Sequence, residues 1–167
     1  MELNNPNTKP YPMSMMGDNP LYVFSGTDML STVLANIPYL ESTGKTVVIA
    51  DHYLMRPKSG DPDFGAKVAQ ILSSLQACRL VMITERRPED QTIISAVENV
   101  LTAQGCSFEY SNADIAHDRY WACVENGKGL LMNSLNGIGV RSSEILSLPA
   151  EDVQDFLLDV RNHGVQI

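Results

Sequence analysis

Apolar residues in this chain follow two patterns, continuous runs and helical stripes. Two runs rich in Val and Ile, Thr46–Leu54 and Arg79–Thr84, are typical of strands buried on both faces of a sheet. Apolar residues spaced three or four positions apart predict helices over Asp63–Ala77 and Pro88–Gly105. Since a helical crossover of this length joins parallel strands, we expect the two runs to lie adjacent and parallel.

The remaining segments complete the predicted order of elements. A short strand over Leu21–Phe24 precedes a helix whose N-cap lies in Ser25–Asp28 and which Pro38 shortens. Another strand spans Ser107–Tyr110, two strands of a hairpin follow, and a last helix begins after Pro149. This helix is expected to bury Val153, Phe156, Leu157 and Val160. The order β-α-β-α-β-α-β-β-β-α implies an α/β fold with a mixed, largely parallel sheet flanked by helices.

Length and charge limit the possible organisation. The 167 residues suit one domain, and residues 1–19, rich in Asn, Pro and Met without periodicity, are expected to form a flexible arm before a single domain over 20–167. Twelve Lys and Arg against twenty Asp and Glu give a formal net charge of -8. Bulk charge therefore disfavours coating of nucleic acid or anionic membrane, whereas a focused basic cleft remains possible.

The location and redox state are predicted from what the sequence lacks. It has no apolar run long enough to span a bilayer, and Met1–Gly17 lacks the basic and apolar regions of a signal peptide. We therefore expect a cytoplasmic protein without integral membrane association. Cys78, Cys106 and Cys123 are odd in number and widely spaced, so we expect reduced thiols with a packing role, and neither a metal nor a cofactor.

Candidate chemistry gathers on the predicted hairpin. Its strands are Ile115–Trp121 and Leu131–Gly137, and the turn Glu125–Gly129 contains the Asn-Gly pair typical of hairpins. Because side chains alternate along a strand, each strand is expected to present two polar side chains on one face. If the two faces coincide, these side chains converge where an anionic group such as phosphate can bind.

Asp51 is a further candidate, because it lies at the end of the buried strand that begins at Thr46. Open α/β sheets place their ligand crevices at such strand ends. The predicted ligand-binding residues are His117, Arg119, Ser134, Asn136 and Asp51. Among them Arg119 can hold a phosphate bidentately through its planar guanidinium.

Purely structural interpretations of the same side chains remain open. His117 can be a structural histidine that is bonded by Asp118 or by a backbone carbonyl. Arg119 can form a buried ion pair with Asp51 or Glu144, and Asp51 can instead cap a neighbouring loop.

The hairpin motif resembles that of the phospholipase D-like superfamily, in which H-x-K is followed by a downstream Asp and by G-S-x-N on the next strand. His117 stands at the position of the catalytic nucleophile, Arg119 at that of the Lys, and Asn133–Asn136 at that of G-S-x-N. Val124 or Glu125 occupies the position of the downstream Asp, and the hairpin is longer than in the enzymes.

The His-Asp-Arg variant resembles a non-classical branch of that superfamily. This branch includes the C-terminal domain of MIT-domain proteins, which has a phospholipase D-like fold without the full catalytic set. An earlier strand ending in Asp-Pro-Tyr in that branch matches the strand ending in Asp51-His52-Tyr53 here. The resemblance covers the chain from Thr46 to Arg141 and implies a phospholipase D-like half.

The function that the resemblance implies is a single-motif domain with a degenerate active site. Such a domain binds a phosphodiester or another anionic ligand, or serves as an assembly module, by analogy within a mobile-element or phage-related system. One alternative is a homodimeric, metal-independent phosphodiesterase or nuclease, in which one His117 attacks phosphorus and the other protonates the leaving oxygen. Another alternative is a purely structural domain that binds a protein partner.

Overall fold

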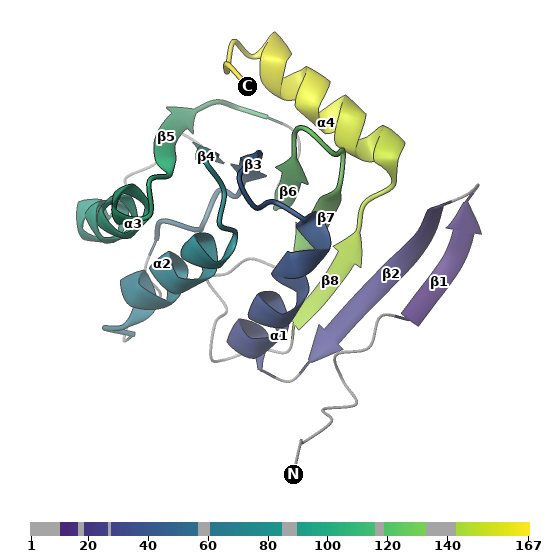
Figure 1. Ribbon diagram of the computed structural model, residues 1–167, viewed down its shortest axis with the longest axis horizontal. Coiled ribbons are helices and arrows are strands. Elements are labelled where there is room, and N and C mark those ends of the chain that lie inside the picture. Colours follow the sequence, from purple (N-terminus) through teal and green to yellow (C-terminus); the bar gives the residue numbers. More distant parts are fainter. Residues whose placement is uncertain are drawn as a thin grey trace.

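A mixed β-sheet forms the centre of the computed structural model, which describes residues 11–16, 19–26, 28–56, 61–84, 90–115, 119–132 and 143–167, the first two segments and residue 143 as backbone only. The strands are β1 (Tyr11–Met16), β2 (Asn19–Gly26), β3 (Thr46–Ala50), β4 (Arg79–Thr84), β5 (Ser107–Asn112), β6 (Tyr120–Cys123), β7 (Gly129–Met132) and β8 (Ser143–Ser147). These eight described strands form one sheet in the order β1-β2-β8-β7-β6-β3-β4-β5 (Figure 1).

The predicted α/β class with a mixed sheet is confirmed. β3 and β4 lie adjacent and parallel, as expected, with Thr46 opposite Arg79 and Ala50 opposite Ile83. β5 is parallel to β4, whereas the other five pairs of described strands are antiparallel. The sheet is less parallel than the sequence predicted, because β1, β2 and β8 add antiparallel pairs and β6 pairs antiparallel with β3.

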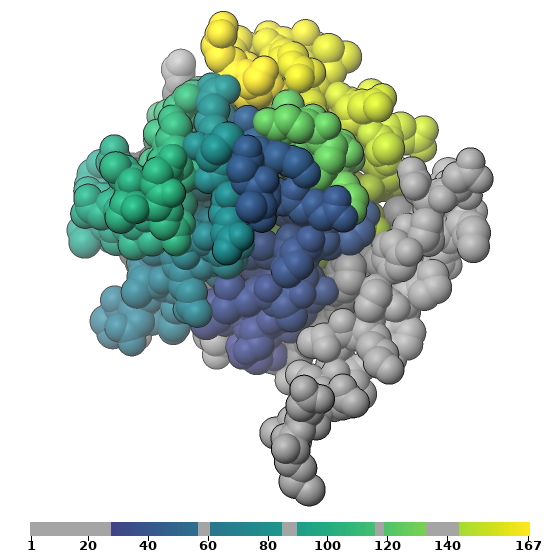
Figure 2. All heavy atoms as spheres, viewed as in Figure 1, coloured from purple at the N-terminus to yellow at the C-terminus, as the bar shows by residue number. Residues whose placement is uncertain are grey.

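Helices cover both faces of the sheet. They are α1 (Met29–Asn36), the 3₁₀-helix η2 (Ile37–Leu40), α2 (Phe64–Ser74), α3 (Gln91–Ala103) and α4 (Ala150–Asn162). α1, α2 and α3 pack on one face around the fully buried Trp121, and α4 packs on the other face around Phe156. Figure 1 shows α4 on one side of the strands β6 and β7, and α1 and α2 on the other. In Figure 2 the C-terminal residues (yellow) form the top of the surface.

Local sequence signals explain how these helices begin and end. The carboxylate of Asp28 accepts hydrogen bonds from the backbone N–H groups of Leu30 and Ser31, which caps α1 as predicted. Pro38 is the second residue of η2, which begins directly after α1 ends. The four apolar residues predicted to face inward in α4 are all buried. In α3 the apolar Val100 is 37% exposed, because α3 lies over the edge strand β5 and no described strand lies beyond it.

The strand predicted over Thr46–Leu54 ends at Ala50. After it the chain turns, since the backbone N–H of Tyr53 donates to the Asp51 carboxylate and the N–H of Arg56 donates to the Tyr53 carbonyl. Leu54 and the residue after it are nevertheless buried in the core. Apolar residues therefore indicate that this segment is buried, but they do not distinguish a buried turn from a buried strand.

Part of the segment expected to be an arm belongs to the sheet. Tyr11–Met16 forms β1, which pairs with β2 and has an irregular register between Pro12 and Ser14.

Candidate functional site

Polar residues gather at one edge of the sheet, where the parallel strands β3, β4 and β5 have their carboxyl ends. Asp51 directly follows β3, Thr84 is the last residue of β4, and Asn112 is the last residue of β5. β6 runs antiparallel to β3, so Arg119, which precedes β6, lies at the same edge. We call the following described residues the polar edge: Asp51, Tyr53, Arg56, Thr84, Tyr110, Asn112 and Arg119. This is the edge at which open α/β sheets bind ligands.

Asp51 is deeply buried in the polar edge, with 1% of its surface exposed, the same fraction as Thr84. Its Oδ1 accepts a hydrogen bond of 2.9 Å from the backbone N–H of Tyr53, and its own N–H donates to the carbonyl of Ile83 at 3.1 Å. The predicted capping role of this carboxylate is therefore present. The side chain lies at the polar edge as well, so the structural and ligand-binding interpretations apply to the same position.

Arg119 adopts a backbone conformation that the sequence did not indicate. Its φ angle is 69°, in the left-handed region, and its carbonyl accepts a hydrogen bond of 3.1 Å from the N–H of Met132. The prediction that a regular strand includes Arg119 is wrong, since β6 begins at Tyr120. Side-chain alternation therefore cannot place Arg119 on one face with His117. In the observed register Ala50 pairs with Tyr120, so Asp51 and Arg119 adjoin the same pair of residues.

Three of the predicted site residues cannot be placed. His117, Ser134 and Asn136 lie outside the described residues. The hairpin that would carry them is confirmed in its described part, where β6 and β7 pair in antiparallel register. The predicted Asn-Gly turn joins them, with Gly127 at a φ of 68°.

A small hydrogen-bonded group at the polar edge was missed by sequence reasoning. The hydroxyl groups of Thr84 and Tyr110 are 2.8 Å apart and share a hydrogen bond, and the Thr84 hydroxyl donates to Oδ1 of Asn112 at 3.4 Å. Arg56 was not identified as a candidate from the sequence either. The available signal was that the apolar runs of β3 and β4, and the more polar strand β5 after them, are each followed or closed by a polar residue.

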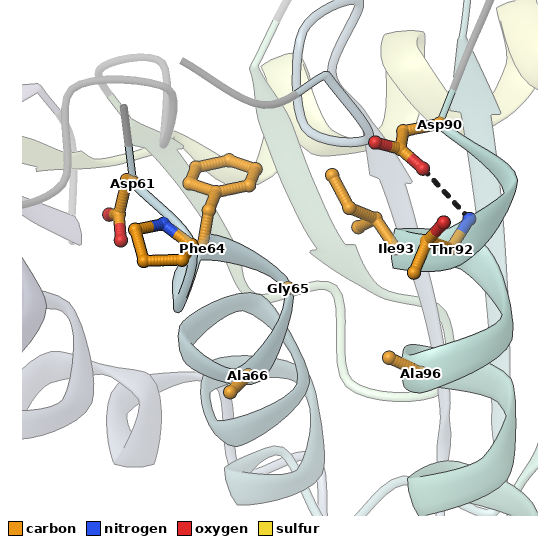
Figure 3. A pocket seen from close by; sticks show the side chains of 9 residues that line it. Asp61, Phe64, Gly65, Ala66, Asp90, Thr92, Ile93 and Ala96 are labelled. Atoms are coloured by element: carbon orange, nitrogen blue, oxygen red, sulfur yellow. Dashed lines mark hydrogen bonds between the residues drawn. The ribbon is translucent and has the colours of Figure 1, made fainter. Parts of the chain in front are cut away.

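An open cavity of about 330 Å³ lies between the first turns of α2 and α3 (Figure 3). The side chains of Phe64 and Ile93 point toward each other across it, and the lining is mostly apolar. Its carboxylates are already engaged. Asp61 forms an ion pair of 2.8 Å with Lys67, whose hydrogen bond holds the pKa of Asp61 below its ordinary value, and Asp90 caps α3. Among the described residues, those that line this cavity include two carboxylates and neither Lys nor Arg, so the cavity is unsuitable for an anion.

Glu125, one candidate for the family's downstream carboxylate, lies at the opposite end of β3 from the polar edge. Both of its carboxylate oxygens are 3.0 Å from the backbone nitrogen of Thr46, the first residue of β3. Burial raises the pKa of Glu125, but hydrogen bonds from backbone amides outweigh this effect and leave the pKa below its ordinary value. This carboxylate therefore supports the sheet and does not contribute to the polar edge.

Within the described ranges, no cluster of three or more His, Cys, Asp or Glu side chains is placed to hold a metal ion. The three cysteines are free thiols, with Cys78 exposed and Cys106 and Cys123 buried. No helix in the same part of the chain combines the length and the apolar character needed to cross a membrane.

Comparisons with known proteins give distant structural similarities only. No family model and no curated protein matches the sequence. Polyphosphate kinase from Porphyromonas gingivalis is similar over 88% of this chain, with a TM-score of 0.49 and 11% identity. TrmBL2, an archaeal chromatin protein with a novel mode of DNA binding, is similar over 90% of it, with a TM-score of 0.43 and 8% identity. The chain spans 26% and 54% of these two proteins, respectively, and neither similarity assigns it a function.

Proposed function

We propose that this chain is a phospholipase D-like domain with a degenerate active site that binds a phosphodiester or another anionic group at the polar edge. Arg119 is the principal contact to the anion in this proposal, and Asp51 ends the neighbouring strand of the same site. The motif residues His117, Ser134 and Asn136, taken from the sequence, complete the site from the hairpin.

The observation that carries the proposal is the conformation and place of Arg119. A residue other than glycine in the left-handed region is strained, and such strain concentrates at functional sites. Glu41 and Gln76 also have positive φ angles, but among these three residues Arg119 carries a half-buried guanidinium at the edge where sheets of this class bind ligands. A guanidinium binds phosphate through two parallel, charge-assisted hydrogen bonds.

Because the chain as a whole is acidic, anion binding must depend on a local group of residues. A chain with a net charge of -8 does not attract polyanions through its general surface. Arg79, near the opposite end of β4, is already paired with Glu109 at 2.7 Å. Anion binding must therefore depend on the few cations at the polar edge, and removal of one of them should have a large effect.

The test is the affinity of the protein for a labelled single-stranded oligonucleotide at fixed salt concentration. Arg119→Ala should lose about 1.5–3 kcal/mol of binding free energy, the value of a hydrogen bond to a charged group. Arg161→Ala is the matched control, because it removes the same charge from an exposed position on α4.

Circular dichroism would verify that both variants keep the fold. Unchanged affinity in a folded Arg119→Ala variant would contradict the proposal and favour a role as an assembly module.

A further inference from the structure

Arg56 is held close to the end of β3 by two successive turns. Its backbone N–H donates to the Tyr53 carbonyl at 3.1 Å, and its guanidinium carbon lies 5.6 Å from the centre of the Tyr53 ring. This distance is within the range of a cation–π interaction. Stacking of a guanidinium on a ring uses its flat face, so the N–H groups in its plane stay available for hydrogen bonds.

Two nitrogen atoms of this guanidinium have no acceptor within the described part of the chain. Nε and Nη2 of Arg56 are buried, and neither has a hydrogen-bond partner among the residues that the structure describes. Buried polar groups in folded proteins are almost always hydrogen-bonded, so each exception requires a specific explanation. An acceptor supplied by a ligand is such an explanation for a group at a ligand-binding edge.

Arg79 in the same chain shows how Nε and Nη2 of a guanidinium bind when two acceptor oxygens are present. Its Nε and Nη2 donate to the two carboxylate oxygens of Glu109 at 2.7 and 2.8 Å. The Nε–H and Nη2–H bonds of a guanidinium are parallel, so they fit two oxygens bound to one central atom. Arg56 has the same pair of donors without the oxygens.

We propose that Arg56 is a second anion-binding residue of the polar edge, and that its Nε and Nη2 receive the two non-bridging oxygens of a phosphodiester. This inference rests on the proposed function, because it names the ligand group that the same edge would bind. It also gives Asp51 a role in positioning. The Asp51 carboxylate fixes the backbone of Tyr53, and the Tyr53 ring supports the guanidinium of Arg56.

Arg56→Lys tests the geometry directly, because it keeps the positive charge and removes the pair of parallel donors. We expect binding of a single-stranded oligonucleotide to weaken about tenfold or more, the loss expected for a charge-assisted hydrogen bond. Arg79→Lys is the matched control, since it removes the same donor pair from an arginine that Glu109 already occupies. Its oligonucleotide affinity should be unchanged.

The outcomes separate the two proposals. If Arg119→Ala weakens binding and Arg56→Lys does not, the inference about Arg56 is wrong and the proposed function stands. If Arg56→Lys weakens binding and Arg119→Ala does not, the Arg56 site stands and the proposed role of Arg119 is wrong.

Thermal unfolding in inorganic phosphate provides a readout that does not depend on nucleic acid. Because a ligand that binds only the folded state raises its stability, phosphate should raise the Tm of the wild-type protein more than that of Arg56→Lys. The variant removes no hydrogen bond of the Arg56 guanidinium to a described residue, so it should fold. An equal increase of Tm in both proteins, or none in either, would overturn the inference.

Discussion

The carboxylate of Asp51 accepts a hydrogen bond of 2.9 Å from the backbone N–H of Tyr53, and this contact lies at the point where β3 ends. Apart from Asp51 and His52, the sequence from Val47 to Met55 is largely apolar, and from this pattern the sequence predicted a strand that extends to Leu54. The short-range hydrogen bond instead turns the chain and brings Tyr53 and Arg56 together at the polar edge. A buried carboxylate thus shapes the region in which we propose that the ligand binds.

This hydrogen bond predicts a difference between two substitutions at Asp51. Asp51→Ala should lower the free energy of unfolding by about 1–3 kcal/mol, because it leaves the N–H of Tyr53 without its acceptor. Asp51→Asn retains an acceptor oxygen and should lose less. Urea unfolding of both variants measures the difference. Equal losses in the two variants would show that the negative charge matters and the hydrogen bond does not.

Close packing between β7 and α4 predicts that Gly129→Ala destabilises the protein. A Cβ atom at Gly129 would lie 2.5 Å from Cγ2 of Val153 and 3.0 Å from Cδ1 of Leu148. Val153 is fully buried, so it has little room to move, and we expect a loss of about 1–3 kcal/mol in the free energy of unfolding.

Gly65→Ala in α2 is the control for that substitution. There the new Cβ would meet Ile93 Cγ1 at an ordinary 3.6 Å, and replacing glycine within a helix should stabilise the protein by about 0.5–1 kcal/mol. Thermal or urea denaturation should therefore give effects of opposite sign. A neutral Gly129→Ala variant would mean that α4 can shift away from β7 at little cost.

The pair of Arg79 and Glu109 predicts a small dependence of stability on pH. The hydrogen bond from Arg79 lowers the pKa of Glu109, so the folded state favours the ionised carboxylate. The resulting stabilisation is present above the pKa of the unfolded chain and is lost as the pH falls through the lower pKa of the folded state. Because the Glu109 side chain is 46% exposed, we expect only about 0.2–1 kcal/mol.

Glu109→Gln measures this contribution. The variant should be slightly less stable than the wild type at neutral pH and should approach it in acid, as followed by urea unfolding at both pH values. A difference that grows in acid would contradict the assigned direction of the pKa shift.

We predict that the chain is a weak or inactive phosphodiesterase, even if it forms a homodimer. Val124 stands at one candidate position for the family's downstream Asp, and the carboxylate of Glu125 is bonded to Thr46 at the far end of β3. Arg119 can stabilise charge on phosphorus, but the arrangement that would support the histidines is incomplete. The hairpin is also longer than in the enzymes, and a displacement of the reacting groups by about 1 Å alone can reduce the rate of hydrolysis about 100-fold.

The measurement is turnover of bis-p-nitrophenyl phosphate and of single-stranded DNA without added metal, with His117→Ala as the comparison. The two proteins should show equally low rates. Robust hydrolysis that disappears in His117→Ala would refute the degenerate site and favour the homodimeric phosphodiesterase.

The sequence by itself determined most of the layered architecture. The two Val- and Ile-rich runs, separated by a helical stripe, predicted the parallel pair β3 and β4, and the spacing of apolar residues predicted α2, α3 and α4. It also indicated Asp51 as a polar residue closing a buried strand and Asn126-Gly127 as the hairpin turn. These features depend on local periodicity and turn chemistry, which neighbouring residues specify without help from the rest of the fold.

Only the tertiary structure decided the geometry of the polar edge. Besides the local hydrogen bond to Asp51, the turn after β3 is held by a contact with a distant residue, the hydrogen bond from the N–H of Asp90 to the carbonyl of Met55. Arg119 directly precedes β6, which begins beside β3, and its backbone is left-handed rather than extended. Its carbonyl accepts a hydrogen bond from the N–H of Met132 across the hairpin. Apolar periodicity reports whether a residue is buried. It does not report whether the buried backbone is a strand or a turn, because that choice depends on partners far away in the sequence.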